Sequence, residues 1–183
     1  MKKGSRVLII ILLAACVCLG AYLVVSLQPA ERPGPAPPPP RPAEAPKKVK
    51  IYRVAVENNQ PELRATETDV RPGENPMEAS LRRLIEQGDT ADLANPIPKG
   101  TRLLGLKVKD GLATVNLSRE FRDNFSGGSE AERLTIGAIL RTLGQFPKVK
   151  RVLFLVEGKP LDTLGHLDLS GPQEVSWAYG DNN

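Results

Sequence analysis

A single uncharged run dominates the start of the chain. Residues 7–27 carry no charged side chain and are apolar apart from one glycine, one tyrosine and one serine. At about 1.5 Å per residue, a helix of this length covers about 30 Å, the thickness of a bilayer's hydrocarbon core. The pattern predicts a transmembrane helix or signal anchor over residues 7–27. Because two lysines and an arginine lie in residues 1–6, we expect this basic tip in the cytoplasm and the rest of the chain outside it, in a periplasm or on the outer surface.

Two other interpretations of this run are open to comparison. A cleaved signal peptide has a shorter apolar region than residues 7–27, so it is disfavoured. Residues 13–16, Leu-Ala-Ala-Cys, resemble a lipobox, in which Cys16 would be lipidated, although the apolar run continues beyond it. The uncleaved anchor is favoured over the lipid anchor, and both attach the remaining chain to a membrane.

Proline dominates the segment that follows. Nine of the seventeen prolines lie between residues 29 and 46, where no apolar residue other than proline is larger than alanine. Such a composition cannot build a core and favours an extended polyproline II conformation. Residues 28–48 are therefore predicted to be a disordered linker that spaces the next domain from the membrane, in preference to a ligand for a proline-recognising domain.

The pattern changes again over residues 49–172, where short segments of strand and helix periodicity alternate. β-Forming residues predict strands over 49–56 and 63–70, joined by a turn. Asn75, Pro76 and Glu78 suit the N-cap, the first turn and the capping box of a short amphipathic helix that ends before residue 88.

Asp110 and Gly111 separate two alternating segments, and this pair favours a two-residue type I′ turn in a hairpin. The loop length sets the register and predicts five cross-strand pairs. These are Val108 with Ala113, Leu106 with Val115, Leu104 with Leu117, Lys107 with Thr114, and Gly105 with Asn116.

The main helix is expected next, from a second capping box of Ser129 and Glu132 to a stop at Pro147. A central strand over 149–156 and an edge segment over 164–169 follow, and residues 173–183 are expected to be a flexible tail. The predicted fold class is α+β: a mixed or antiparallel sheet with β-hairpins and two helices packed on one face.

Charge and cysteine content exclude several classes of function. The formal charge is +4, but from residue 47 onward twenty basic residues meet nineteen acidic ones. A body so nearly neutral, without an aromatic platform or zinc spacing, argues against nucleic-acid binding. Both cysteines, Cys16 and Cys18, lie in the apolar run, so the domain has no disulfide and no thiol nucleophile.

Several short motifs, taken in order, resemble a known family, the GerMN or sporulation and spore germination domain, over most of residues 50–172. The residues that carry the resemblance are Pro98, Gly100, Leu103 and Leu104; Asp110 and Gly111, continuing through residues 113–118 to Phe121; Thr142, Leu143 and Phe146; and Val156, Gly158, Gly165, His166, Leu167, Asp168, Leu169 and Ser170.

This resemblance implies an extracytoplasmic α+β module, often tethered by a lipid or a helix and linked in spore formers to sporulation and germination. Members are not known as enzymes, so it implies no catalytic residue and no cofactor. The roles it implies are structural, at Pro98, Gly100, Asp110, Gly111, Gly158, Gly165, His166 and Asp168.

Few residues of the domain are candidates for catalysis or metal binding. His166 is the only histidine, with Asp168 two residues on and Ser118, Ser170 and Asp162 as conceivable companions. One imidazole and no thiol is too few for a usual zinc site, and no serine lies in a nucleophile-elbow context. We expect His166 and Asp168 to close a turn at the sheet edge, with no catalytic and no metal site.

Two further features admit a binding function. Gly127 and Gly128 before a helix start favour an ordinary loop over an anion site, because no P-loop lysine follows. The basic groups Lys47, Lys48 and Lys50, and Lys148, Lys150 and Arg151, are expected to be solvated; their natural partner is an anionic lipid surface or a cell-wall polymer.

The sequence therefore predicts a membrane-anchored, non-catalytic module that binds a protein partner in the cell envelope. We expect it to act in an envelope process or in sporulation or germination. The alternative is a lipoprotein that binds cell-wall glycan or a small ligand. A hydrolase or metal enzyme is disfavoured.

Overall fold

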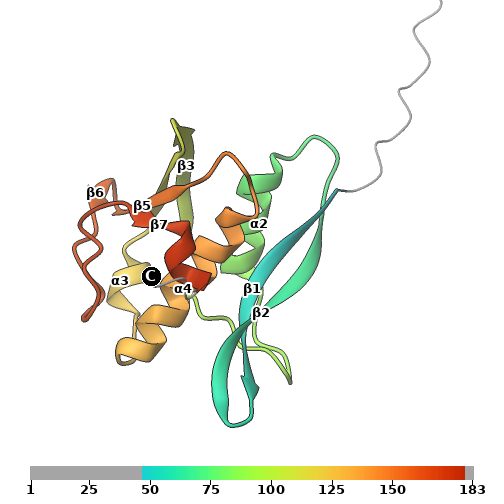
Figure 1. The fold of residues 1–183 in the computed structure, drawn as a ribbon, viewed down its shortest axis with the longest axis vertical. Helices are drawn as coiled ribbons and strands as arrows, with labels where there is room; N and C mark the ends of the chain where they lie inside the picture. The colour runs from blue at the N-terminus through green and yellow to red at the C-terminus, as the bar shows by residue number, and fades with distance from the viewer. Residues whose placement is uncertain (1–46, 180–183) are drawn as a thin grey trace, which may run out of the picture. The chain divides into compact units, whose positions relative to one another are not determined.

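The computed structural model describes residues 47–179, and the predicted anchor over residues 7–27, Cys16 and the linker before Lys47 lie outside this range. In the described elements, groups of strands are separated by helices (Figure 1). In chain order they are β1 (Lys47–Glu57), β2 (Gln60–Val70), α2 (Pro76–Glu86), β3 (Leu103–Lys109), β4 (Leu112–Leu117), α3 (Glu120–Asp123), α4 (Ser129–Gly144), β5 (Arg151–Val156), β6 (Lys159–Pro160), β7 (Gln173–Glu174) and the 3-10 helix η1 (Val175–Tyr179).

A mixed sheet forms the centre of the fold, which is α+β as predicted. Its strands run in the order β3-β4-β5-β6, and β7 also pairs with β5. β4 and β5 are parallel and the other pairs are antiparallel. One face of the two central strands is fully buried: Val115 lies beside Phe154 and Ala113 beside Val152. These side chains share one core with buried leucines and isoleucines of α2 and α4.

The β3–β4 hairpin follows the predicted register over most of its length. Asp110 and Gly111 have φ angles of 50° and 81°, as a type I′ turn requires. The predicted pair Leu104 with Leu117 is wrong, because an irregularity in β3 places Leu103 opposite Leu117 instead. Leu103 therefore enters the core, and Leu104 is 46% exposed.

The first two strands form a separate antiparallel hairpin (Figure 1). β1 begins at Lys47, so the strand includes the last two residues of the predicted linker, 28–48. Side chains of α4 and its C-cap residue bond the edge of β1. Thr142 Oγ1 accepts from the Tyr52 N–H, and the amide of the C-cap Gln145 bonds both the N–H and the C=O of Lys50. These contacts cover backbone groups that would otherwise remain unpaired at the edge.

The two longer helices begin in different ways. Asn75 caps α2 as predicted, its Oδ1 accepting from the Met77 N–H at 3.0 Å, whereas the Glu78 carboxylate bonds Arg82. The predicted capping box at α4 is wrong. The N-cap is Gly128 with no side-chain cap bond, and Glu132 is fully buried and bonded elsewhere.

The C-terminal part of the described chain is more ordered than predicted. Residues 164–169 do not form a strand but a loop whose Leu169 is fully buried. The predicted flexible tail is corrected as far as residue 179, since β7 and η1 occupy residues 173–179. Val175 and Ala178 are buried, and Arg141 of α4 donates to the Ala178 carbonyl at 2.7 Å. Within residues 47–179, no helix is both long and apolar enough to span a bilayer.

Candidate functional site in the motif loops

The motif glycines all lie in backbone conformations that few other residues adopt. The φ angles of Gly100, Gly111, Gly158 and Gly165 are 84°, 81°, 77° and 150°. A side chain at these positions would strain the backbone, so each glycine allows its loop to turn. Pro98 belongs to the first of these turns, where its carbonyl accepts from the N–H and the hydroxyl of Thr101.

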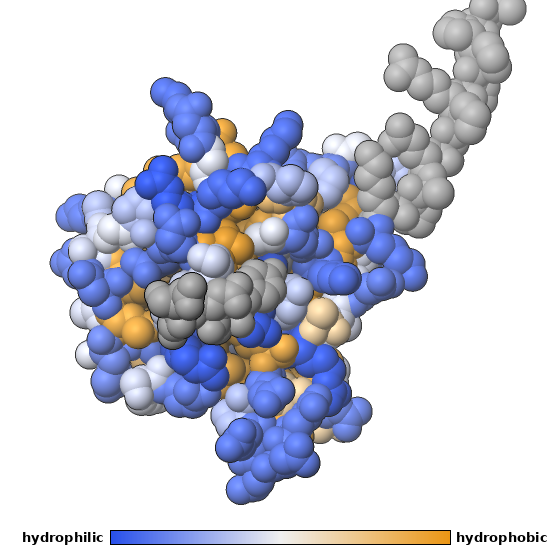
Figure 2. Space-filling model, viewed as in Figure 1, coloured by the Kyte–Doolittle hydropathy of each residue, from blue (hydrophilic) through white to orange (hydrophobic). Residues whose placement is uncertain are grey.

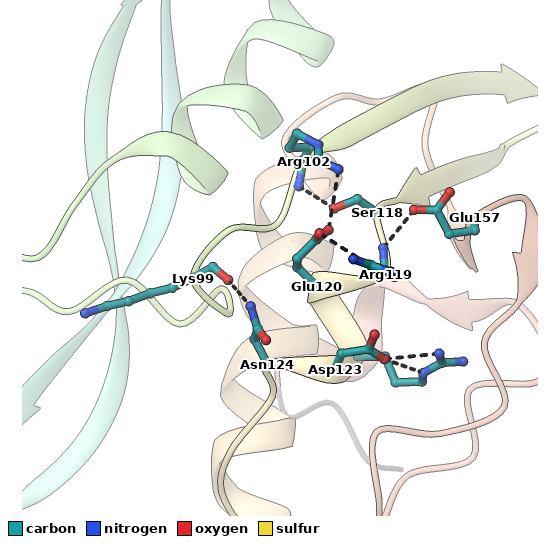
Figure 3. A network of polar contacts seen from close by, with 9 residues as sticks. Lys99, Arg102, Ser118, Arg119, Glu120, Asp123, Asn124 and Glu157 are labelled. Atoms are coloured by element: carbon teal, nitrogen blue, oxygen red, sulfur yellow. Dashed lines mark hydrogen bonds and ion pairs between the residues drawn. The ribbon is translucent and has the colours of Figure 1, made fainter.

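Polar side chains join the loops that follow the parallel strands β4 and β5. Asn116 Oδ1 accepts from the Gly158 N–H at 2.8 Å. The Glu157 carboxylate accepts from the Arg119 N–H at 3.0 Å (Figure 3). The Glu157 N–H in turn donates to the Leu117 carbonyl. These hydrogen bonds connect the loops at the carboxyl-terminal ends of β4 and β5.

The short helix α3 adds a charged network beside these loops (Figure 3). Ser118 Oγ accepts from the Arg102 N–H at 2.9 Å, and the Ser118 hydroxyl is the main cause of a lowered pKa at Glu120. Arg102 and Arg119, 3.7 and 3.6 Å from the Glu120 carboxylate, lower this pKa further. Asn124 Nδ2 donates to the Lys99 carbonyl and so ties α3 to the loop of Pro98.

Glu132, expected in a capping box, instead binds the loop that contains His166. Its side chain is fully buried in α4, and its two oxygens accept from the N–H groups of Leu164 and His166 at 2.9 and 2.7 Å. His166 Nδ1 lies 3.3 Å from the same carboxylate. A signal was present in the sequence, since Glu132 has helical spacing with Ile136 and Ile139 on the buried face of α4.

His166 and Asp168 do not act as a pair. They were expected to close a turn at the sheet edge; their segment is a loop, in which His166 approaches Glu132. Asp168 accepts from the N–H and the hydroxyl of Ser170, at 3.0 and 2.6 Å. The Ser170 hydroxyl bond, followed by the backbone bond, lowers the pKa of the Asp168 carboxyl. Both residues thus shape the same loop through different partners.

Gly127 and two members of the basic groups have partners or roles in the local structure. Gly127 has a φ of 145°, and a Cβ at this position would lie 2.5 Å from the Ala131 Cβ, which explains a glycine before α4. Of the basic groups, Lys48 pairs with Glu67 and Arg151 with Glu174. In the described part of the chain, no three His, Cys, Asp or Glu side chains gather where they would hold a metal ion.

A surface hollow of about 350 Å³ adjoins the loop of Pro98. Phe125 is its only aromatic lining residue, and Asn124 and Lys99 contribute polar atoms. The loop before β3 and the connection from α3 to α4 form its walls. A hollow with a few polar groups and an aromatic ring is a place where a small ligand can bind.

Comparison with protein families gives one match, to the sporulation and spore germination family, over residues 44–162. The matched segment includes strands β1 to β6 and helices α2 to α4, and it ends before β7. The chain belongs to this family. The match ends before the Glu132-bound loop is complete, so Asp168 and Ser170 lie beyond it.

Solved structures show the same GerMN fold. A protein of Clostridium perfringens described as a candidate lipoprotein is 27% identical, with a TM-score of 0.51, covering 70% of this chain and 87% of that one. The first GerMN domain of the sporulation protein GerM from Bacillus subtilis is 18% identical, with a TM-score of 0.58, covering 70% of this chain and 97% of that one. The tandem GerMN domains of GerM are 19% identical, with a TM-score of 0.59, covering 75% of this chain and 48% of the tandem. No curated protein matches the chain.

Proposed function

We propose that this GerMN-domain chain is a membrane-tethered module that acts outside the cytoplasm by binding an envelope protein, in sporulation, germination or a related envelope process, without catalysis. The proposal rests on the hydrogen bonds made by the polar side chains in and beside the motif loops. Glu132, Ser118, Asn116 and Asp168 all bond backbone N–H groups. Side chains engaged in this way stabilise loops, which leaves surface complementarity as the means of action.

The tether is supported by the sequence before the domain. Residues 7–27 are uncharged and long enough to cross a bilayer, and basic residues precede them. The proline-rich residues after this run give the domain reach from the membrane surface. The similarity to a candidate lipoprotein agrees with a location in the envelope.

Site-specific photocrosslinking in intact cells tests the proposed function. A photoreactive amino acid is placed at exposed positions on separate surfaces of the full chain: Val56, Val108, Lys159 and Ser126. We expect at least one position to give a discrete crosslinked product containing an envelope protein. Products absent at all four positions would contradict an interaction module.

The hollow beside Pro98 favours a second candidate function, binding of cell-wall glycan. In that case Phe125 would stack against a sugar ring, as aromatic side chains do in ligand pockets. Sedimentation of the full chain with purified peptidoglycan distinguishes the two functions. Glycan binding requires that Phe125→Leu lowers the sedimented fraction while Phe146→Leu, outside the hollow, leaves it unchanged. The interaction module predicts no sedimentation above that of the chain alone.

A further inference from the structure

The outer edge of β3 is free. β3 is the first strand of the sheet and pairs only with β4. Within residues 47–179, no backbone hydrogen bond connects its other edge to a further element. A free edge presents unpaired N–H and C=O groups that can pair with an added strand.

Apolar side chains are exposed along this edge. Leu104, which has no partner on β4, is 46% exposed, and Val108 is 38% exposed. They are two of the three large hydrophobic residues that are exposed in the described part of the chain. Figure 2 shows hydrophobic surface between hydrophilic residues in the region of β3 and α2.

A hollow of about 480 Å³ lies between this edge and the start of α2. Leu106 and Val108 form its β3 side, since both lie on the face of β3 that points toward the core. Met77 and Phe146, both half-buried, contribute from across the hollow. An edge that borders an apolar hollow can hold both the backbone and the alternate side chains of an extended peptide.

Most of the unpaired charges around this edge are positive, and the exposed Asp110 in the turn after β3 is the exception. Lys107 and Lys109 are exposed on the opposite face of β3, and Lys148 lines the hollow. Within residues 47–179 none of these three lysines is in an ion pair. Glu78, the acid that lines the hollow, is already bonded to Arg82. The edge is therefore complementary to an acidic partner.

We propose that β3 receives an extended segment of the envelope partner, in which apolar side chains alternate with acidic ones. This inference rests on the proposed function and deepens it by assigning a surface and a peptide chemistry. The segment pairs with the β3 backbone, places its apolar side chains in the hollow, and directs its carboxylates toward Lys107 and Lys109. The alternation follows from the two-residue period of a strand.

A second copy of the chain fits this edge less well. Antiparallel pairing of two β3 strands about Leu106 would make the two Lys107 side chains diagonal neighbours on one face. No acid of β3 would offset their repulsion. The proline-rich residues of the same chain also fit poorly, because proline lacks the N–H that a ladder requires.

Peptide binding to the full chain in detergent tests the chemistry. The probes are a fluorescent peptide of alternating valine and glutamate, the same peptide with lysine in place of glutamate, and the glutamate peptide N-methylated at alternate residues. We expect the glutamate peptide to bind, the other two to bind at least about tenfold more weakly, and added salt to weaken binding.

Variants locate the peptide on the protein. The double change Lys107→Glu and Lys109→Glu should weaken binding about tenfold or more, whereas Lys159→Glu, an exposed lysine of β6, should not. Circular dichroism confirms that each variant is folded. Lack of binding by the glutamate peptide, or equal binding by the double variant, would overturn the proposal.

The crosslinking experiment separates failure of this inference from failure of the proposed function. A crosslink from Val108 to a peptide with alternating apolar and acidic residues supports the edge. Crosslinks from Val56, Ser126 or Lys159 without one from Val108 overturn the edge and leave the interaction module standing. Crosslinks from none of the positions overturn both.

Discussion

At the scale of single residues, Glu132 connects α4 to the loop after β6. Its buried carboxylate accepts hydrogen bonds from two backbone N–H groups of that loop. Hydrogen bonds to a charged group contribute about 1.5–3 kcal/mol each. We expect Glu132→Ala to lower the free energy of unfolding by about 3 kcal/mol or more, measured by urea denaturation.

His166→Ala is the matched control for Glu132. The imidazole is half-exposed, and its contact with Glu132 is longer than the backbone bonds. We expect this variant to lose less than about 1 kcal/mol. A larger loss in His166→Ala than in Glu132→Ala would show that the ring, not the backbone N–H pair, organises the loop.

Asp168 carries a prediction about pH. The Ser170 hydroxyl lowers its pKa, so the ionised carboxylate is favoured in the folded state. Its stabilising contribution is present above the carboxyl pKa of the unfolded chain and is lost as the pH falls through the lower folded value. We expect Ser170→Ala to raise the pKa of Asp168, measured by NMR titration of the carboxyl carbon. Ser126→Ala, a change at an exposed serine elsewhere, should leave it in place; an unshifted pKa in Ser170→Ala would contradict the assigned cause.

The role of a residue could be predicted from the sequence where its hydrogen-bond partners are close in the chain. It could not be predicted where those partners are distant. Asn75 was identified as a cap because the capping oxygen and its N–H partners lie within three residues. Glu132 satisfied the capping-box spacing equally well, yet its partners lie more than thirty residues away. Only its place on the apolar face of α4 indicated that it would be buried.

At the scale of elements, the β3–β4 turn depends on Gly111. Its φ of 81° is left-handed, and a Cβ would meet only the flexible Lys150 side chain at 3.4 Å. The cost of a substitution therefore comes from the backbone, about 1–2 kcal/mol. We expect Gly111→Ala to destabilise the domain by this amount in thermal or urea unfolding, whereas Gly171→Ala, with open space and no left-handed φ, should be nearly neutral. Equal losses in the two variants would contradict the turn assignment.

The elements that were predicted correctly have local signals. The Asp-Gly turn fixed four of the five cross-strand pairs, and the remaining one changed because of the irregularity next to Leu103. β7 and η1 were missed because they depend on distant contacts. The Val175 N–H donates to the Lys150 carbonyl, and the Ala178 carbonyl accepts from Arg141. No sequence pattern within residues 173–179 predicts these distant contacts.

At the scale of the whole molecule, we propose that the sequence before the GerMN domain anchors it to a membrane. The two cysteines distinguish the helical anchor from a lipid anchor, because only Cys16 follows a lipobox-like sequence. We expect Cys16→Ser to remain in the membrane fraction at the level of Cys18→Ser, after carbonate washing. Release of the Cys16→Ser chain alone would show that a lipid holds it instead.

The most direct measurement asks on which side of the membrane the domain lies. Both native cysteines are changed to serine, and Val56→Cys, at a position 70% exposed, provides one reactive thiol. We predict that a membrane-impermeant maleimide labels this thiol in intact cells, and labels Ser5→Cys only after lysis. Labelling of Val56→Cys that requires lysis would place the domain in the cytoplasm and contradict the account.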